Sequence, residues 1–250
     1  MLWELKVMFA ATAVVFLLAL YFGIFLYPYR EHSEQTKTRP RSFISNAYFR
    51  EFWYFMMGPF KIKLIKWGVH PNTITWVGFL FSVVAGVAFA YGQFGVAGWM
   101  TIFAATCDVY DGQIARARSI SLKSGSYLDS VLDRIGEAAM FFGLVWFFRN
   151  DVLWFWTIFL GFTASNLVSY ARSRAEGLGY GGARGFFQRA ERMIVLSVGM
   201  SLYPVMEYFT SYSREWLYFT LGFLCWGSVQ TALSRSISIY REMVRDEAKA

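Results

Sequence analysis

The sequence predicts an all-α integral membrane protein: a six-helix transmembrane core, preceded by a juxtamembrane amphipathic helix and by one extra N-terminal transmembrane helix. Of the 250 residues, 56% are hydrophobic and only 16% are charged, whereas a soluble domain is usually about a quarter charged. The apolar residues form runs long enough to cross a bilayer, and no strand-like alternation competes with them. The net charge of +7 does not indicate nucleic-acid binding, because the basic residues cluster between the apolar runs.

Residues 1–42 are expected to form an anchor followed by a linker. The first apolar span runs from about Val7 to Tyr27. It is too long for the apolar region of a signal peptide, and no small-residue cleavage site follows it, so we expect it to be retained. The segment from Arg30 to Arg41 is polar and basic, which is typical of a linker. Residues 43–250 are expected to form one membrane domain.

This domain is predicted to begin with a helix on the membrane surface. Residues Phe43 to Trp67 mix aromatic side chains with basic ones, a composition that favours an interfacial amphipathic helix. Gly68 and Pro71 then interrupt the chain. Six apolar spans follow, joined by short polar or glycine-containing turns. They are Thr73–Tyr91, Val96–Arg116, Leu128–Phe148, Val152–Arg172, Ala190–Met206 and Trp216–Ile237.

The distribution of basic residues predicts the orientation of the chain. If the N-terminus lies outside, an odd number of spans places the C-terminus in the cytoplasm. The outside then keeps only Lys6, Arg149 and Arg214, and all other Lys and Arg residues beyond the spans are cytoplasmic. This agrees with the positive-inside rule. We therefore expect a protein of the cytoplasmic membrane with its C-terminus inside.

Four aspartates lie at the cytoplasmic ends of two consecutive spans. Carboxylates within a membrane are costly and are therefore candidates for a functional site. The uncharged stretch from Val96 to Cys107 forms about 18 Å of helix, too short for a hydrocarbon core of about 30 Å. Asp108 and Asp111 must consequently lie within the cytoplasmic leaflet. Asp129 and Asp133 begin the next span, and we expect them at a similar depth.

Helical spacing places these acids on two defined faces. Positions i, i+3 and i+7 of the earlier helix share one stripe, and positions i, i+4 and i+8 of the later helix share another. The two stripes are Asp108, Asp111 and Ala115, and Gly125, Asp129 and Asp133. A hairpin of these helices can therefore point all four carboxylates at one another.

Four unpaired carboxylates at this depth would repel one another strongly unless cations joined them. Ligands that are all oxygen favour Mg²⁺, Mn²⁺ or Ca²⁺ over zinc. Gly112 and Gly125 would let a ligand approach the backbone, and Arg116 could bind a phosphate oxygen. The alternative is structural: the aspartates pair with nearby arginines such as Arg118 and Arg134, and the glycines serve helix packing.

The complete pattern resembles a known family signature. It reads Asp108-x-x-Asp111-Gly112-x-x-Ala115-Arg116, eight residues, then Gly125-x-x-x-Asp129-x-x-x-Asp133. This is similar to the signature of the CDP-alcohol phosphotransferase family, integral membrane enzymes of phospholipid synthesis. The family transfers a phosphatidyl-type group from a CDP-linked lipid to an alcohol and releases CMP. The resemblance covers the chain from about Phe43 to the C-terminus and leaves the first span without a counterpart.

The resemblance implies roles for individual residues. Asp108, Asp111 and Asp129 would bind divalent metal, Mg²⁺ or Mn²⁺ and two ions in all. Asp133 would complete the metal site and act as general base. Seven residues would contact the cytidine nucleotide: Asn72, Thr73, Asp111, Gly112, Ala115, Arg116 and Gly125. Because family members are commonly homodimers, the resemblance also implies a homodimer.

A basic cluster bears on the identity of the alcohol. Its arginines could bind an anionic acceptor, or they could serve topology and lipid headgroups. They are Arg172, Arg174, Arg184, Arg189 and Arg192. The run Tyr170-x-Arg-x-Arg-Ala-Glu with a later Arg-x-Glu-Arg is similar to the phosphatidylinositol-phosphate synthase branch. That branch accepts inositol phosphate, and by resemblance Arg172, Arg174, Arg189 and Arg192 would bind its phosphate.

Other acceptors and other functions stay open. Ser173, Gln188 and Ala190 depart from the pattern of that branch, so glycerol 3-phosphate, another phosphorylated polyol or a free alcohol such as serine are alternatives. A divalent-cation transporter could use the same carboxylates, although it predicts acids at several depths, and here only Glu137 lies deeper. A non-catalytic lipid-binding protein would have no need of every acidic position in the signature.

Overall fold

The computed structural model describes residues 2–29, 47–120, 122–181 and 185–249. The predicted linker, the first residues of the predicted surface helix and Arg184 lie outside these ranges. The described residues form helices and turns, and no strand occurs among them. The helices are α1 Leu2–Tyr21, η1 Phe22–Leu26 with π-helical geometry, η2 Tyr27–Tyr29, α3 Ala47–Lys66, α4 Pro71–Ala90, α5 Phe94–Ala117, α6 Lys123–Phe147, α7 Val152–Gly177, α8 Arg189–Ser201, α9 Tyr203–Phe209 and α10 Ser213–Glu247.

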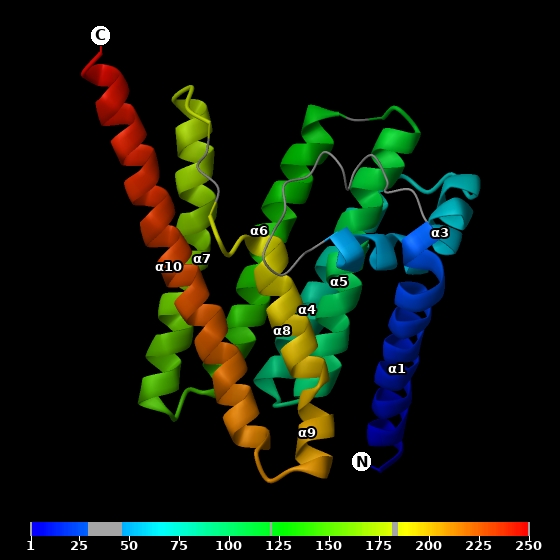
Figure 1. Cartoon of the computed structure of the whole chain (residues 1–250). Helices are drawn as coiled ribbons and strands as arrows, with labels where there is room; N and C mark the ends of the chain where they lie inside the picture. The colour runs from blue at the N-terminus through cyan, green and yellow to red at the C-terminus, as the bar shows by residue number, and fades with distance from the viewer. Residues whose placement is uncertain (1, 30–46, 121, 182–184, 250) are drawn as a thin grey trace.

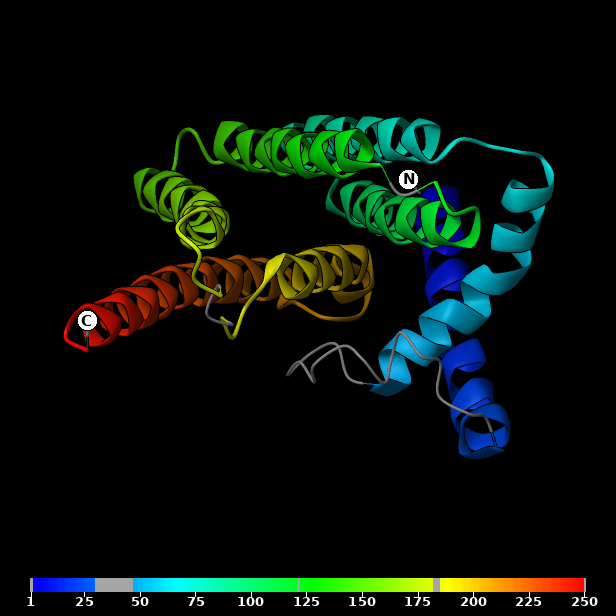
Figure 2. The ribbon, with the colours of Figure 1, turned by 90° about the horizontal axis from the view of Figure 1, so that it is seen from above.

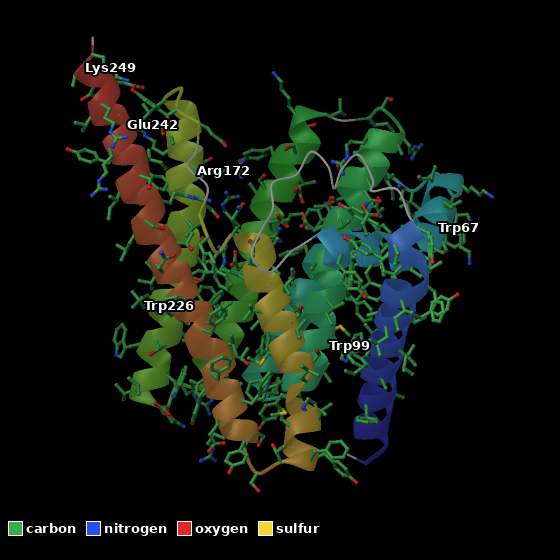
Figure 3. The ribbon with its side chains drawn as sticks, in the orientation of Figure 1. Trp67, Trp99, Arg172, Trp226, Glu242 and Lys249 are labelled. Atoms are coloured by element: carbon green, nitrogen blue, oxygen red, sulfur yellow. The ribbon has the colours of Figure 1, made fainter. Side chains whose placement is uncertain are left out.

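The predicted all-α class is confirmed, and the described chain holds helices able to cross a membrane. Three segments are long and apolar enough to do so: Phe9–Tyr29, Pro71–Ala90 and Val152–Gly177. Large aromatic side chains also cover the outer surface. Figure 3 shows Trp67 at the end of α3 and Trp226 on α10, and both are more than half exposed. Exposed apolar surface on this scale is what a lipid environment stabilises.

Some predicted spans differ from the observed helices. The predicted span Ala190–Met206 is divided into α8 and α9 at Leu202, because Pro204 has no amide hydrogen to continue the helical ladder. The helix α10 continues ten residues past the predicted end at Ile237, since its charged residues form helix well in water. The helix α6 begins at Lys123 rather than Leu128, so that Gly125 lies within it. Hydropathy detects only the apolar part of each helix.

The helix α4 packs between α5 and α6, which do not pack closely against each other. Glycines permit the close approach of α4 and α6, because a Cβ on Gly143 would collide with the carbonyl oxygen of Gly86. Figure 2 shows α4 and α6 along one side of the bundle and α8 and α10 along the other. The predicted hairpin of two helices is therefore incomplete: a third helix holds the two acidic helices together.

The main apolar core lies toward one end of the bundle. It includes Phe89, Phe141, Leu144, Met200 and Leu221, all completely or almost completely buried. These residues come from the halves of α4 and α6 that are remote from the aspartates, and from α8 and α10. The core therefore braces the bundle at that end and leaves the opposite end for the acidic residues.

The N-terminal helices form a separate cluster at the edge of the bundle (Figure 1). Phe22 is completely buried, and its ring lies 5.9 Å from that of Tyr48, 5.7 Å from Phe52 and 5.2 Å from Phe55, measured between centroids. This aromatic cluster joins the end of α1 to α3, which runs across the direction of the other helices in Figure 1. Among residues 9–21 of α1, most of the large apolar side chains are exposed.

Candidate active site

The four aspartates of the signature meet in one cavity. Oxygen atoms of Asp108 and Asp111 on α5 and of Asp129 on α6 lie within 4.8 Å of one another. Asp133, one turn further along α6, lines the same cavity. The wall between the two acidic helices is supplied by α4, through Thr75, Gly78, Phe79 and Ser82. The spacing within each helix thus sets the faces, and α4 sets the distance between them.

The donor set fits a hard divalent cation. All candidate ligands are carboxylate oxygens, which suit Mg²⁺ or Mn²⁺. Asp129 Oδ1 is buried and has no hydrogen-bond partner among the described residues. A buried carboxylate oxygen without a partner is costly, and a bound cation would remove that cost. Asp108, Asp111 and Asp129 are therefore the residues that could hold a metal ion.

Thr75 belongs to this site, although sequence reasoning missed it. Its hydroxyl donates a hydrogen bond of 2.8 Å to Asp111 Oδ2 and lies 3.3 Å from the carbonyl oxygen of Pro71. The bond orients one oxygen of Asp111 at the cavity. The available signal was the position of Thr75, one helical turn after Asn72, which the nucleotide prediction already included.

Arg189, at the start of α8, lies against two of the aspartates. Its Nη2 donates a hydrogen bond of 2.6 Å to Asp133 Oδ1, and its Nη1 pairs with Asp133 Oδ2. The same Nη1 lies 3.2 Å from Asp108 Oδ2. The sequence assigned Arg189 to the acceptor phosphate. In the structure its guanidinium forms part of the acidic cavity and balances some of its negative charge.

The nucleotide candidates gather at the same end of the bundle. A Cβ on Gly125 would lie 3.2 Å from Asn72 Oδ1, so α6 and the start of α4 come together at this point. Asn72 is placed there by its backbone amide, which donates to Nδ1 of His70, the N-cap of α4. On α5, the Arg116 guanidinium lies over Gly112. The two other candidates, Thr73 and Ala115, lie at the same ends of α4 and α5.

Arg118, which the structural alternative paired with the aspartates, instead holds this region together. Its Nη1 donates to the carbonyl oxygens of Gly68 and Val69, both at 3.0 Å. These carbonyls belong to the turn between α3 and α4. The bonds therefore tie the end of α5 to the chain that leads into Asn72.

The remaining arginines of the basic cluster occupy different environments. Arg172 lies near the end of α7 (Figure 3) and is exposed. It pairs with Glu176 at 2.8 Å, and Arg174 is also exposed. Arg192 is completely buried and pairs with Glu137 at 2.9 Å, so it does not line the acidic cavity. These arginines are close in the sequence, but in the structure Arg172 and Arg174 are exposed whereas Arg192 is buried.

Another buried arginine, Arg235 on α10, was not anticipated. Its Nη1 donates a 2.9 Å hydrogen bond to the carbonyl oxygen of Val168 on α7. A Cβ on Gly185 would lie 3.2 Å from its Nη2, so the chain before α8 passes close to this guanidinium. Arg235 therefore adds positive charge between α7 and α10, and its distance from the cluster in the sequence gave no sign of this.

The fold and the site together define a class. A helical membrane bundle that carries clustered carboxylates beside arginines is suited to a divalent cation and a phosphate-bearing substrate. A sequence model of the CDP-alcohol phosphatidyltransferase family matches residues 68–227. The chain belongs to this family, which confirms the predicted resemblance and makes the protein a membrane transferase of that kind.

Relatives extend the comparison. The phosphatidylinositol phosphate synthase of Streptomyces avermitilis is 30% identical over 211 residues, covering 81% of this chain and 85% of that protein. The enzyme of the same name from Cutibacterium acnes is 32% identical over 159 residues, 62% of this chain and 77% of that protein. The archaetidylinositol phosphate synthase of Pyrococcus horikoshii is 34% identical over 161 residues, 60% of this chain and 84% of that protein.

Solved structures agree with the fold. The phosphatidylinositol phosphate synthase of Mycobacterium tuberculosis with CDP-DAG bound gives a TM-score of 0.64 at 28% identity, covering 73% of this chain and 92% of that one. The same enzyme in complex with manganese and citrate gives a TM-score of 0.66 at 27% identity, covering 73% of this chain and 88% of that one.

Proposed function

We propose that this protein transfers a phosphatidyl group from a CDP-linked lipid to the hydroxyl of inositol phosphate and releases CMP. The observation that carries the proposal is the cavity in which Asp108, Asp111 and Asp129 converge beside Asp133 and Arg189. It combines sites for cations with a positive charge for phosphate. The matched family region, residues 68–227, contains all five residues.

The choice of acceptor is supported by the relatives. Those from Streptomyces and Pyrococcus are named for products that share an inositol phosphate headgroup and differ in the lipid, phosphatidyl in one and archaetidyl in the other. The basic groups proposed for an acceptor phosphate are those of Arg172 and Arg174 on α7 and of Arg189 on α8. The buried Arg192 is proposed to stabilise α8 through its pair with Glu137. Glycerol 3-phosphate and serine are the alternative acceptors that the assay below compares.

The metal is proposed to be Mg²⁺ or Mn²⁺, with two ions held by Asp108, Asp111, Asp129 and Asp133. The manganese in the related Mycobacterium tuberculosis structure supports this assignment. When bound, such cations neutralise the pyrophosphate charge that develops as CMP departs. Asn72, Thr73, Gly112, Ala115, Arg116 and Gly125, together with Asp111, are proposed to hold the CDP portion.

Asp133 is proposed to act as general base. The alcohol oxygen attacks the lipid-side phosphorus, its proton passes to Asp133, and the phosphorus–oxygen bond to CMP breaks with its electrons leaving on CMP. Arg189 contacts both oxygens of Asp133, and each oxygen keeps a second lone pair that can accept that proton. The guanidinium has further N–H groups that can donate to the acceptor phosphate, which reconciles its two possible roles.

We propose the topology that the sequence predicts. We place residues 1–42 as an anchor and linker, and residues 43–250 as the transferase domain with a surface helix and six spans. The N-terminus would lie outside the cytoplasmic membrane, and the cavity and C-terminus would face the cytoplasm. In this orientation the lipid tails stay in the bilayer while CMP and the acceptor exchange with water. The domain is proposed to work as a homodimer.

The function is tested by CMP release. Purified protein in detergent micelles with CDP-diacylglycerol and Mn²⁺ should form CMP fastest with inositol phosphate, compared with glycerol 3-phosphate, serine and free inositol. A preference for another acceptor would overturn the acceptor assignment. No CMP with any alcohol would overturn the reaction itself. Mn²⁺ flux into liposomes without CDP-lipid would instead support a transporter.

A further inference from the structure

Two ion pairs bridge α6 and α8, which do not pack closely against each other. Asp133 and Glu137 are spaced i, i+4 on α6, and Arg189 and Arg192 are spaced i, i+3 on α8. The outer pair, Asp133 with Arg189, lies in the acidic cavity. The inner pair, Glu137 with Arg192, lies one turn deeper. The long arginine side chains thus span the gap between the two helices.

The inner pair is buried and geometrically constrained. Arg192 donates from Nε to Glu137 Oε1 at 2.9 Å and from Nη2 to Oε2 at 3.2 Å, a two-pronged contact that fixes the guanidinium plane. Ser165 on α7 donates a third hydrogen bond of 2.6 Å to the same carboxylate. Both charged groups are buried, and Arg192 has no exposed surface. Three helices therefore meet at one satisfied carboxylate.

This inner pair also holds the chain that leads into α8. Phe187 is completely buried, and its amide donates to Thr231 Oγ1 on α10 at 3.0 Å. Its carbonyl oxygen lies 3.5 Å from Arg192 Nη1. Rotation of α8 about its axis would break the contact of Arg192 with Glu137. It would also move Arg189, which lies one turn away on the same helix.

We propose that Glu137 is a positioning residue for the transfer reaction: through Arg192 it fixes the first turn of α8 and so holds Arg189 against Asp133 and Asp108. The catalytic meaning of this inference rests on the proposed function, whereas the positioning itself rests on the contacts. A purely structural ion pair would stabilise the fold without affecting Arg189 in particular. The two roles predict different measurements.

The kinetic test uses Glu137→Gln, which removes the charge and keeps the shape. We expect kcat to fall by about 10- to 100-fold and KM for the phosphorylated acceptor to rise, with KM for CDP-lipid unchanged, because misplacing a reactive group by about 1 Å has effects of this size. In an Arg189→Ala background the same substitution should have almost no further effect, since coupled residues are not additive. Equal and additive losses in both backgrounds would overturn the proposal.

A second test does not need turnover. Free Mn²⁺ is measured by electron paramagnetic resonance during titration of the purified full chain. Arg189→Ala should tighten Mn²⁺ binding, because it removes a positive charge from Asp108 and Asp133. Glu137→Gln should shift the affinity in the same direction and add nothing to Arg189→Ala. The control, Asp246→Asn, removes a carboxylate from an exposed pair with Lys249 and should leave binding unchanged.

Two further comparisons keep the outcomes separate. If Glu137→Gln does not fold, the double variant Glu137→Gln with Arg192→Gln leaves no unpaired buried charge and should show the same Mn²⁺ shift relative to wild type. A lowered thermal midpoint with unchanged kinetics and unchanged Mn²⁺ affinity would overturn the positioning role. Failure of the wild type to form CMP would overturn the proposed function alone, and the Mn²⁺ titrations would still decide the role of Glu137.

Discussion

Individual side chains outside the signature shape the acidic cavity. Thr75 directs one oxygen of Asp111, and Arg189 occupies both oxygens of Asp133. Neither residue is an acid, yet each decides which carboxylate oxygens are free for a cation or a proton. The chemistry of the cavity therefore depends on the orientation of its acids as much as on their number.

Thr75→Val should weaken metal binding. Valine keeps the shape of the side chain but cannot donate to Asp111, and loss of such an orienting contact typically lowers metal affinity by about 10- to 100-fold. The measurement is Mn²⁺ titration followed by electron paramagnetic resonance. Ser82→Ala is the matched control, because the Ser82 hydroxyl lines the same cavity but bonds the carbonyl of Gly78 on its own helix. Unchanged affinity in Thr75→Val would contradict the role given to this bond.

Asp133→Asn should abolish most of the turnover. The amide cannot accept the proton of the alcohol, and loss of a general base typically lowers the rate by about 10²- to 10⁴-fold. CMP formation under saturating substrates measures the loss. Arg134→Ala, on the neighbouring exposed residue that bonds Ser130 on its own helix, should leave turnover close to wild type. Full activity in Asp133→Asn would assign the base elsewhere.

At the scale of the helices, α4 decides how far apart the acidic helices lie. Its closest approach to α6 is at Gly86 and Gly143, where the backbones touch. Side chains larger than hydrogen have no room there. The packing of α4 thus converts two separate acidic stripes into one cavity.

Gly143→Ala should destabilise the bundle. The added methyl group would collide with the carbonyl oxygen of Gly86, and overpacking of this kind costs about 1–3 kcal/mol. The thermal midpoint in detergent should fall by several degrees. Gly177→Ala is the control, because a Cβ there meets no atom within 4 Å. Equal midpoints for the two variants would show that α4 and α6 can separate at no cost.

The sequence predicted where the helices lie along the chain better than it predicted which helices pack together. The aspartates could be placed because helical spacing is fixed and the apolar run before Asp108 is short. The insertion of α4 could not be predicted, since spacing along one helix says nothing about which helix lies beside it. Arg189 and Arg192 looked equivalent in sequence, and only the position of Glu137 on α6 distinguishes an arginine in the cavity from a buried one. Pro204 could have indicated the break between α8 and α9, but the apolar run across it favoured one continuous predicted span.

At the scale of the whole molecule, the described helices form a bundle, and the N-terminal helices α1 and α3 lie at its edge. The helix α1 contacts the bundle through the rings of Phe9 and Phe209 on α9. The following helix, η1, contacts α3 through the cluster around Phe22. Neither contact reaches the acidic cavity. The predicted resemblance also left this first span outside the family pattern, and the family match begins only at residue 68.

Phe22→Ala and Phe89→Ala should therefore differ, although both rings are completely buried. Loss of a buried phenylalanine costs about 3–5 kcal/mol. For Phe22 the cost falls on the N-terminal cluster, so we expect faster proteolysis near α1 with unchanged turnover and Mn²⁺ affinity. For Phe89 it falls on the main core, so the thermal midpoint should drop. Loss of Mn²⁺ binding in Phe22→Ala would show that the two parts are coupled.

The glycine contact between α4 and α6 has a mechanical consequence. Gly143 lies fourteen residues from Asp129, or about 21 Å along α6. The helix α6 can pivot against α4 at this contact, and its acidic end would then move. A tilt of about 5° there would swing Asp129 by about 2 Å, more than a metal ligand can tolerate. Geometry at the carboxylates is thus governed from the opposite end of α6.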